Sequence, residues 1–287
     1  MRYLALAGLL SLAACAPVAG TVTTSTAATT TSTTSDVTTT VATTEGPARC
    51  VEDLEFLESG QVARIDQPTS DASILGLISW DGNGGCERFH LEFDTNEGAP
   101  ATTPPSVTVE FLDSGQILRI NLDLERTVLT DQLVETTLVD RLYVVRALGG
   151  GLFVDLHLAT PSQARATVRN SPAGLTVELQ MGIMPFAGAA TTSDQAVVLE
   201  PAPGSETDTT VEVRGYTRTF EATVLVIATS GGKAVAEATT QAADWVETWG
   251  EFRTSIEVPP GPTSLFVGEE SPEDGTLAGA IVEITAR

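Results

Sequence analysis

Apolar and polar side chains alternate along most of the chain between residues 87 and 287. In the segment ERFHLEFD (87–94), for example, Phe89, Leu91 and Phe93 fall on one side of an extended chain. A period of two is typical of a β-strand with one buried face, and clusters of Gly, Pro and Asn between such segments are typical of turns. Few stretches repeat at the helical period. The pattern therefore predicts an all-β protein.

The first expected domain covers residues 47–182 and has the pattern of a β-sandwich or an open barrel. Residues 130–140 are its best candidate for a helix or a loop. Residues 183–194, rich in Pro, Gly, Ala and Thr, are the expected linker to a second domain. The expected strands of the first domain, besides 87–94, are 106–112, 116–124, 141–148, 151–158, 164–170 and 174–181.

The second expected domain, residues 195–287, consists of short alternating segments separated by turns such as Gly231-Gly232. Seven short strands in a segment of this length suit an immunoglobulin-like β-sandwich. The Cys…Trp…Cys pattern of antibody domains is missing from the sequence. We therefore expect two β-sandwich-like domains, the second of them immunoglobulin-like. The expected strands of the second domain are 196–200, 209–218, 219–229, 233–241, 249–258, 263–270 and 279–287.

Residues 1–14, MRYLALAGLLSLAA, place Arg2 before an apolar run that is too short to span a bilayer permanently. The tetrad that ends at Cys15, Leu-Ala-Ala-Cys, looks like a bacterial lipobox, the signal for cleavage before the cysteine and its lipidation. The alternative is an ordinary secretory signal with a cysteine there by chance. Both interpretations predict export, and the first predicts a chain held on the outer side of the bacterial cell membrane by the lipid on Cys15.

Residues 15–46 are the expected lipid-anchored linker, and from 21 to 44 they are almost entirely Thr, Ser, Ala and Val. The segment has no apolar periodicity, so we expect a disordered tether. About 30 residues of flexible coil have a root-mean-square reach of roughly 30 Å. O-glycosylation of the Thr and Ser residues is an open alternative role.

Cys50 and Cys86 remain once Cys15 is assigned to the lipid. An even pair of cysteines in an exported chain is most simply a disulfide. A metal site is a weaker alternative, because the two cysteines are far apart in sequence and His90 is the sole histidine near them.

The formal net charge is −23, and both expected domains are acidic. Such a surface repels nucleic acid, so we expect no nucleic-acid partner. Lys233 is the only lysine, and His90 and His157 are the only histidines, which removes most lysine-based and histidine-based catalysis. The sequence thus predicts no catalytic residues, no metal site and no cofactor.

Two motifs could nevertheless carry chemistry. Ser230-Gly231-Gly232-Lys233 matches the S-x-x-K signature of penicillin-interacting enzymes, but the required K-T-G box cannot exist with one lysine, so a turn is predicted. His90 with Glu92, and Asp155 with His157, could supply metal ligands from two strands. Both pairs lie on the polar side of amphipathic strands, so we expect them in solvent instead.

Two acidic loops and two tryptophans complete the candidates. Residues 81–85 resemble only the start of a calcium loop, and residues 269–275 hold four carboxylates in a segment that is expected to be solvated, with calcium as the alternative. Trp245 and Trp249 could form a platform for sugar rings or peptide, but core packing is the expectation.

Two resemblances extend this interpretation. The segments CERFHLEF, GLFVDLHLATP and NSPAGLTVEL, over roughly residues 50–182, together resemble the AMIN-like domain of bacterial envelope lipoproteins. The resemblance implies a non-catalytic targeting module that associates with peptidoglycan or other envelope components.

Residues 195–287 resemble the immunoglobulin-like domain of bacterial spore germination. The resemblance rests on LEPAPGSE (199–206), VEVRGYTRTFEATV (211–224), the 230–233 hairpin, the stretch from Trp245 to Phe252, and EESPEDG (269–275), in that order. It implies a binding or scaffolding role and no established catalytic residues.

Together these observations predict a non-enzymatic, lipid-anchored envelope protein that binds or organises envelope material, such as cell-wall glycan or an envelope protein. One alternative is an accessory subunit that presents its β domains to an envelope enzyme or transporter. Another is a carboxylate-dependent hydrolase, which requires paired Asp or Glu side chains in a cleft.

Overall fold

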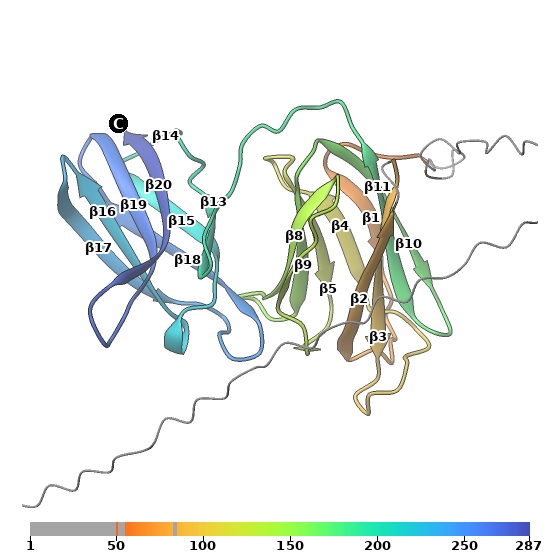
Figure 1. The fold of residues 1–287 in the computed structure, drawn as a ribbon. Helices are drawn as coiled ribbons and strands as arrows, with labels where there is room; N and C mark the ends of the chain where they lie inside the picture. Colours follow the sequence, from red (N-terminus) through yellow and green to blue (C-terminus); the bar gives the residue numbers. More distant parts are fainter. Residues whose placement is uncertain (1–49, 51–54, 83–84) are drawn as a thin grey trace, which may run out of the picture. The chain divides into compact units, whose positions relative to one another are not determined.

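Strands dominate the computed structural model, which describes residue 50, residues 55–82 and residues 85–287 (Figure 1). This part of the chain contains no α-helix, and its one helical element is the short 3₁₀ turn η1 (Phe220–Ala222). No helix in the described ranges is long and apolar enough to cross a membrane. The expected all-β fold class is confirmed.

The first sandwich is built from two groups of strands around one hydrophobic core. One group follows the order β1 (Gln61–Ile65), β4 (Val107–Phe111), β5 (Ile117–Leu122), β9 (Leu152–Leu158) and β8 (Val139–Arg146), with β7 (Asp131–Leu133) also paired to β8. The other follows the order β10 (Ser162–Arg169), β11 (Gly174–Met181), β3 (Glu87–Asp94), β2 (Ile74–Gly82) and β6 (Arg126–Thr127). Side chains from both groups, among them Phe89, Val109 and Leu156, fill the core.

The second sandwich has the same plan and a core of its own, which includes Val213, Phe252 and Leu265. One of its strand groups follows the order β18 (Trp249–Glu257), β15 (Thr210–Thr217), β13 (Ala196–Glu200) and β12 (Thr191–Thr192). The other follows the order β14 (Glu206–Thr207), β20 (Leu277–Ala286), β19 (Gly261–Glu270), β16 (Thr223–Ser230) and β17 (Lys233–Gln241).

One hydrogen-bonded sheet continues from the first sandwich into the second. Strand β18 pairs in parallel with β8, so that Trp249 lies opposite Val145 and Gly250 lies opposite Arg146. The described residues accordingly belong to one compact unit.

The strands predicted by alternation are present within a few residues of their expected ends, but the first sandwich also contains strands that were not predicted, namely β1, β2, β6 and β7. Residues 130–140 form no helix: they contain β7, a loop and the start of β8. Strand β2 was not predicted, because its pairing with β3 shifts register between Leu75 and Leu77. The bulge leaves Leu75 and Ile78 buried and Leu77 exposed. The buried side chains are therefore three residues apart, which breaks the period of two expected for a strand.

A disulfide joins Cys50 to Cys86, the pair expected from the sequence, and both cysteines are buried. It closes a loop with a sequence separation of 36 residues. Cys86 immediately precedes β3, so the bond attaches the start of the described chain to a central strand of its sheet.

We expect the variant in which both cysteines are replaced, Cys50→Ser with Cys86→Ser, to unfold more easily by about 4 kcal/mol, because the open chain gains loop entropy. Chemical denaturation of the two proteins measures the difference. Reductant should bring the unsubstituted protein to the variant's stability and leave the variant unchanged. Equal stability of oxidised and reduced protein would contradict a structural role for the bond.

Candidate functional site

The predicted site residues fall in separate places. Cys15, the expected lipidation site, lies outside the described residues. Cys50 and Cys86 meet Glu178 in the sole group of three metal-ligand side chains within 4.8 Å of one another in the described ranges. Because both sulfur atoms belong to the disulfide, this group lacks the thiolates that a metal would need.

The two histidine–carboxylate pairs do not converge, because β3 and β9 belong to different sheets. On β3, the ring of His90 contacts Asp81 Oδ2 through Nε2 at 3.0 Å and Thr176 Oγ1 through Nδ1 at 3.1 Å. This row of carboxylate, imidazole and hydroxyl runs across β2, β3 and β11 at the sheet surface, with Asp81 also paired to Arg88 at 3.5 Å. His90 is thus partly exposed, as expected from the sequence.

The loop motifs have structural partners. Ser230 to Lys233 is the turn between β16 and β17, with both central glycines at positive φ, and the Ser230 hydroxyl donates to the backbone oxygen of Pro262. In the acidic loop 269–275, Glu269 accepts a hydrogen bond from the backbone N–H of Phe220, and the Asp274 carboxylate accepts from the Thr276 N–H at 3.1 Å. These contacts show that residues 230–233 and 269–275 serve as turns in the fold.

The two tryptophans have different environments, and neither fits the two-ring platform. Trp249 is buried, and its indole N–H donates to Asp131 Oδ1 at 3.1 Å. Trp245 is partly buried against the second core and packs edge-on to Phe220, with 5.3 Å between ring centroids.

Trp249 belongs to a cluster of buried side chains between the two sandwiches, which we call the junction. Its members are Tyr143, Val145, Phe153, Val197, Tyr216 and Trp249. The Tyr143 ring is central, 4.9 Å from the Trp249 ring and 5.2 Å from the Tyr216 ring between centroids. Tilted and edge-on contacts of this kind stabilise aromatic clusters beyond their buried area. The junction therefore holds the two sandwiches together through aromatic packing.

Ionisable side chains from β5 and β9 border the junction. Asp155 is fully buried and forms two hydrogen bonds with Arg119, at 2.8 and 2.7 Å, while the Arg119 guanidinium lies 3.8 Å from the centre of the Phe153 ring. Burial alone would lower the pKa of Arg119, but the carboxylate of Asp155 raises it overall. Arg119 therefore stays charged, and its contact with Asp155 is structural.

His157 lies 2.5 Å, through Nε2, from the hydroxyl of Tyr216, which comes from the other sandwich. Burial lowers the pKa of His157 to about 4, and the Asp155 carboxylate only partly offsets this. Burial likewise raises the pKa of Tyr216 well above its usual value. Both rings are neutral at neutral pH, and the expectation that Asp155 and His157 lie in solvent is wrong because the second sandwich covers them.

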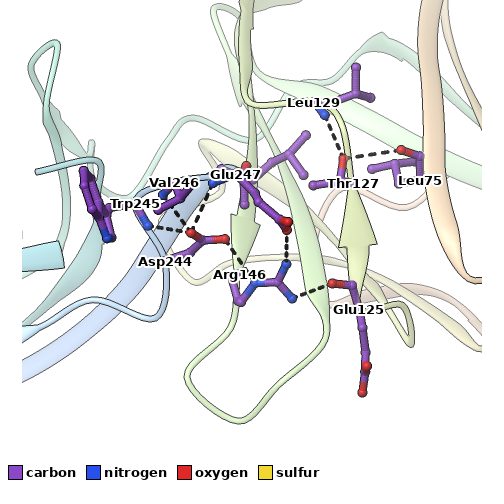
Figure 2. A network of polar contacts seen from close by, with 11 residues as sticks. Leu75, Glu125, Thr127, Leu129, Arg146, Asp244, Trp245, Val246 and Glu247 are labelled. Atoms are coloured by element: carbon purple, nitrogen blue, oxygen red, sulfur yellow. Dashed lines mark hydrogen bonds and ion pairs between the residues drawn. The ribbon is translucent and has the colours of Figure 1, made fainter. Parts of the chain in front are cut away.

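A polar network lies beside the aromatic cluster (Figure 2). Arg146, at the end of β8, contacts Asp244 through Nε at 3.2 Å and Glu247 at 3.2 Å, and donates to the backbone oxygen of Glu125 at 2.6 Å. Asp244 Oδ1 also accepts from the backbone N–H groups of Trp245 and Val246. Burial would raise the pKa of Asp244, but these N–H groups and Arg146 lower it.

A cavity of about 260 Å³ lies between the sandwiches and the 183–194 segment. Its charged lining residues are Glu110, Asp113, Arg119, Glu200, Arg214 and Glu251. Arg214 pairs with Glu200, Glu110 accepts from Asn121 at 2.9 Å, and Glu251 accepts from the Leu148 N–H at 2.9 Å. Mixed charges of this kind suit a small polar ligand at a domain boundary. Sequence reasoning did not find this site.

The comparisons with known proteins agree with the fold of the second sandwich. Residues 195–276 match the family model described as the immunoglobulin-like domain of bacterial spore germination. A search of curated proteins and a search of solved structures each found no match.

The junction should make stability depend on pH through His157. Its pKa of about 4 lies below the unfolded value of 6.5, so the unfolded chain binds a proton between these pH values that the folded chain excludes. The free energy of unfolding should fall by about 3 kcal/mol as pH drops from about 6.5 to 4.

Urea unfolding across this range measures the effect. His157→Gln should lose this component of the pH dependence, whereas the surface variant His90→Gln should keep it. Parallel pH profiles for the unsubstituted protein and His157→Gln would show that His157 does not titrate as inferred.

The Arg146–Asp244 contact should couple the sandwiches. In a double-mutant cycle of Arg146→Met and Asp244→Asn, we expect a coupling energy of about 1–2 kcal/mol, because both side chains are largely buried. Glu247→Gln should change stability by less than about 0.5 kcal/mol, since Glu247 is largely exposed. Additive effects of the first two substitutions would refute the coupling.

Proposed function

We propose that this chain is a non-catalytic, lipid-anchored protein of the bacterial cell envelope that binds envelope material, peptidoglycan in particular, through two β domains. In this proposal residues 1–14 are a signal peptide, Cys15 carries the lipid, and the first sandwich is an AMIN-like targeting module. The match of residues 195–276 to a bacterial immunoglobulin-like domain supports a binding or scaffolding role for the second.

The observation that carries the proposal is the mixed-charge cavity beside a rigid junction. The buried ionisable groups around it, Arg119 with Asp155 and His157 with Tyr216, already engage one another. A preformed cavity with fixed donors and acceptors favours binding of a neutral or zwitterionic ligand, such as a glycan with its attached peptide.

Sedimentation with purified cell wall tests the proposal. We expect the folded protein to sediment with the wall, and we expect binding to fall at least fivefold in the variants Glu110→Gln and Arg214→Gln. The matched control is the surface pair Glu212–Arg253, in which Glu212 shares strand β15 with Arg214 and Arg253 lies on the neighbouring strand β18; its variants should bind as the unsubstituted protein does. Absence of wall binding, with a protein partner recovered from intact membranes, would instead favour an accessory subunit.

The carboxylates of the cavity also favour a second candidate, a carboxylate-dependent hydrolase. Turnover of glycan or ester substrates that is abolished by Glu110→Gln or Glu251→Gln would support it. The existing bonds of both side chains, to Asn121 and to the Leu148 N–H, are the reason for placing it second.

A further inference from the structure

The end of β11 and the loop that follows it expose three large apolar side chains within four residues. Met181 is 58% exposed, Ile183 is 90% exposed and Met184 is 54% exposed. Ile183 is the most exposed large apolar residue in the described ranges. We call Met181, Ile183 and Met184 the apolar loop.

The backbone of the apolar loop is held in place. The Glu58 carboxylate accepts hydrogen bonds from the N–H groups of Ile183, at 3.4 Å, and Met184, at 3.1 Å. The Gly182 N–H donates to Pro161 at 2.8 Å, and a Cβ at Gly182 would lie 2.9 Å from a backbone atom of Ser162. The apolar side chains are thus directed outward by a fixed backbone.

The apolar loop lies near the place where the chain from Cys15 reaches the first sandwich. Cys50 Sγ is 3.5 Å from the backbone oxygen of Leu179, two residues before Met181 on the same strand. Four residues of extended chain span about 13 Å, so Ile183 lies within that distance of Leu179. Leu57 then pairs with Ala164 on β10, which places Glu58 beside the loop.

We propose that the apolar loop contacts the hydrocarbon boundary of the bilayer to which the chain is anchored. The inference rests on the anchor at Cys15 proposed above. The 35 residues from Cys15 to residue 49 would keep the loop at about millimolar effective concentration near the membrane, so a weak apolar contact suffices. The contact orients the first sandwich with its β11 end toward the lipid.

Charge does not drive this contact, because the net charge of −23 repels anionic lipids. Binding should therefore be insensitive to salt on phosphatidylcholine vesicles, and weaker on vesicles that contain phosphatidylglycerol.

The test uses the full chain, lipidated at Cys15 and bound to phosphatidylcholine vesicles, with an environment-sensitive fluorophore attached to Ile183→Cys. The control label is at Ile281→Cys, on β20 of the second sandwich, where the native side chain is 61% exposed. We expect a blue shift and at least a twofold rise in emission at position 183, quenched by nitroxide-labelled lipids, and no change at position 281. The variant Met184→Ser should reduce the rise.

The outcomes separate the two proposals. If the chain floats with vesicles but both labels remain in water, the loop contact is wrong and the anchor stands. If mass spectrometry finds no lipid on Cys15, the anchor is wrong. The loop contact is then tested without the anchor, on the labelled Cys15→Ser chain mixed with vesicles at several millimolar phosphatidylcholine. A blue shift of the label at position 183 supports the loop contact, and the absence of a shift overturns it.

Discussion

Strand β9 is buried on both faces, and this double burial determines much of what surrounds it. Leu156 and its neighbours at alternate positions face the first core, while Phe153, Asp155 and His157 face the junction. A carboxylate placed there must be paired, since an unpaired buried charge costs several kcal/mol. Arg119, directly opposite Asp155 on β5, supplies that partner. The contact between the sandwiches thus depends on an ion pair within the first of them.

Most of the fold was predictable because strand alternation is a local property. A strand with one solvated face, such as β3, can be recognised from its own residues alone, because apolar and polar side chains alternate along it. Strand β2 was missed because the bulge near Leu75 changes which side chains are buried. Residues 130–140, expected to be a helix or a loop, do contain a loop, but β7 was missed because it is three residues long and pairs with β8, which no local pattern records.

The candidate site was not predictable in the same way, because it joins residues that are far apart in the sequence. His157 meets Tyr216 across a sequence separation of 59 residues, and Arg146 meets Asp244 across 98. On β9 the alternation correctly placed Asp155 and His157 on one face, but it could not tell that another domain covers that face. A weak signal existed: the chain has only three tyrosines and three tryptophans, and Tyr143, Tyr216 and Trp249 all belong to the junction.

The contacts within the fold determine how the net negative charge is distributed between the interior and the surface. Arginines such as Arg88, Arg119, Arg146 and Arg165 are engaged by carboxylates within the fold, so their charges are neutralised locally. The surface is left with the excess of carboxylates, which repels anionic polymers and anionic lipid headgroups alike. A partner of this surface is then recognised through neutral groups, through ammonium groups or through apolar contact. The mixed-charge cavity and the apolar loop are the two features described above that offer such chemistry.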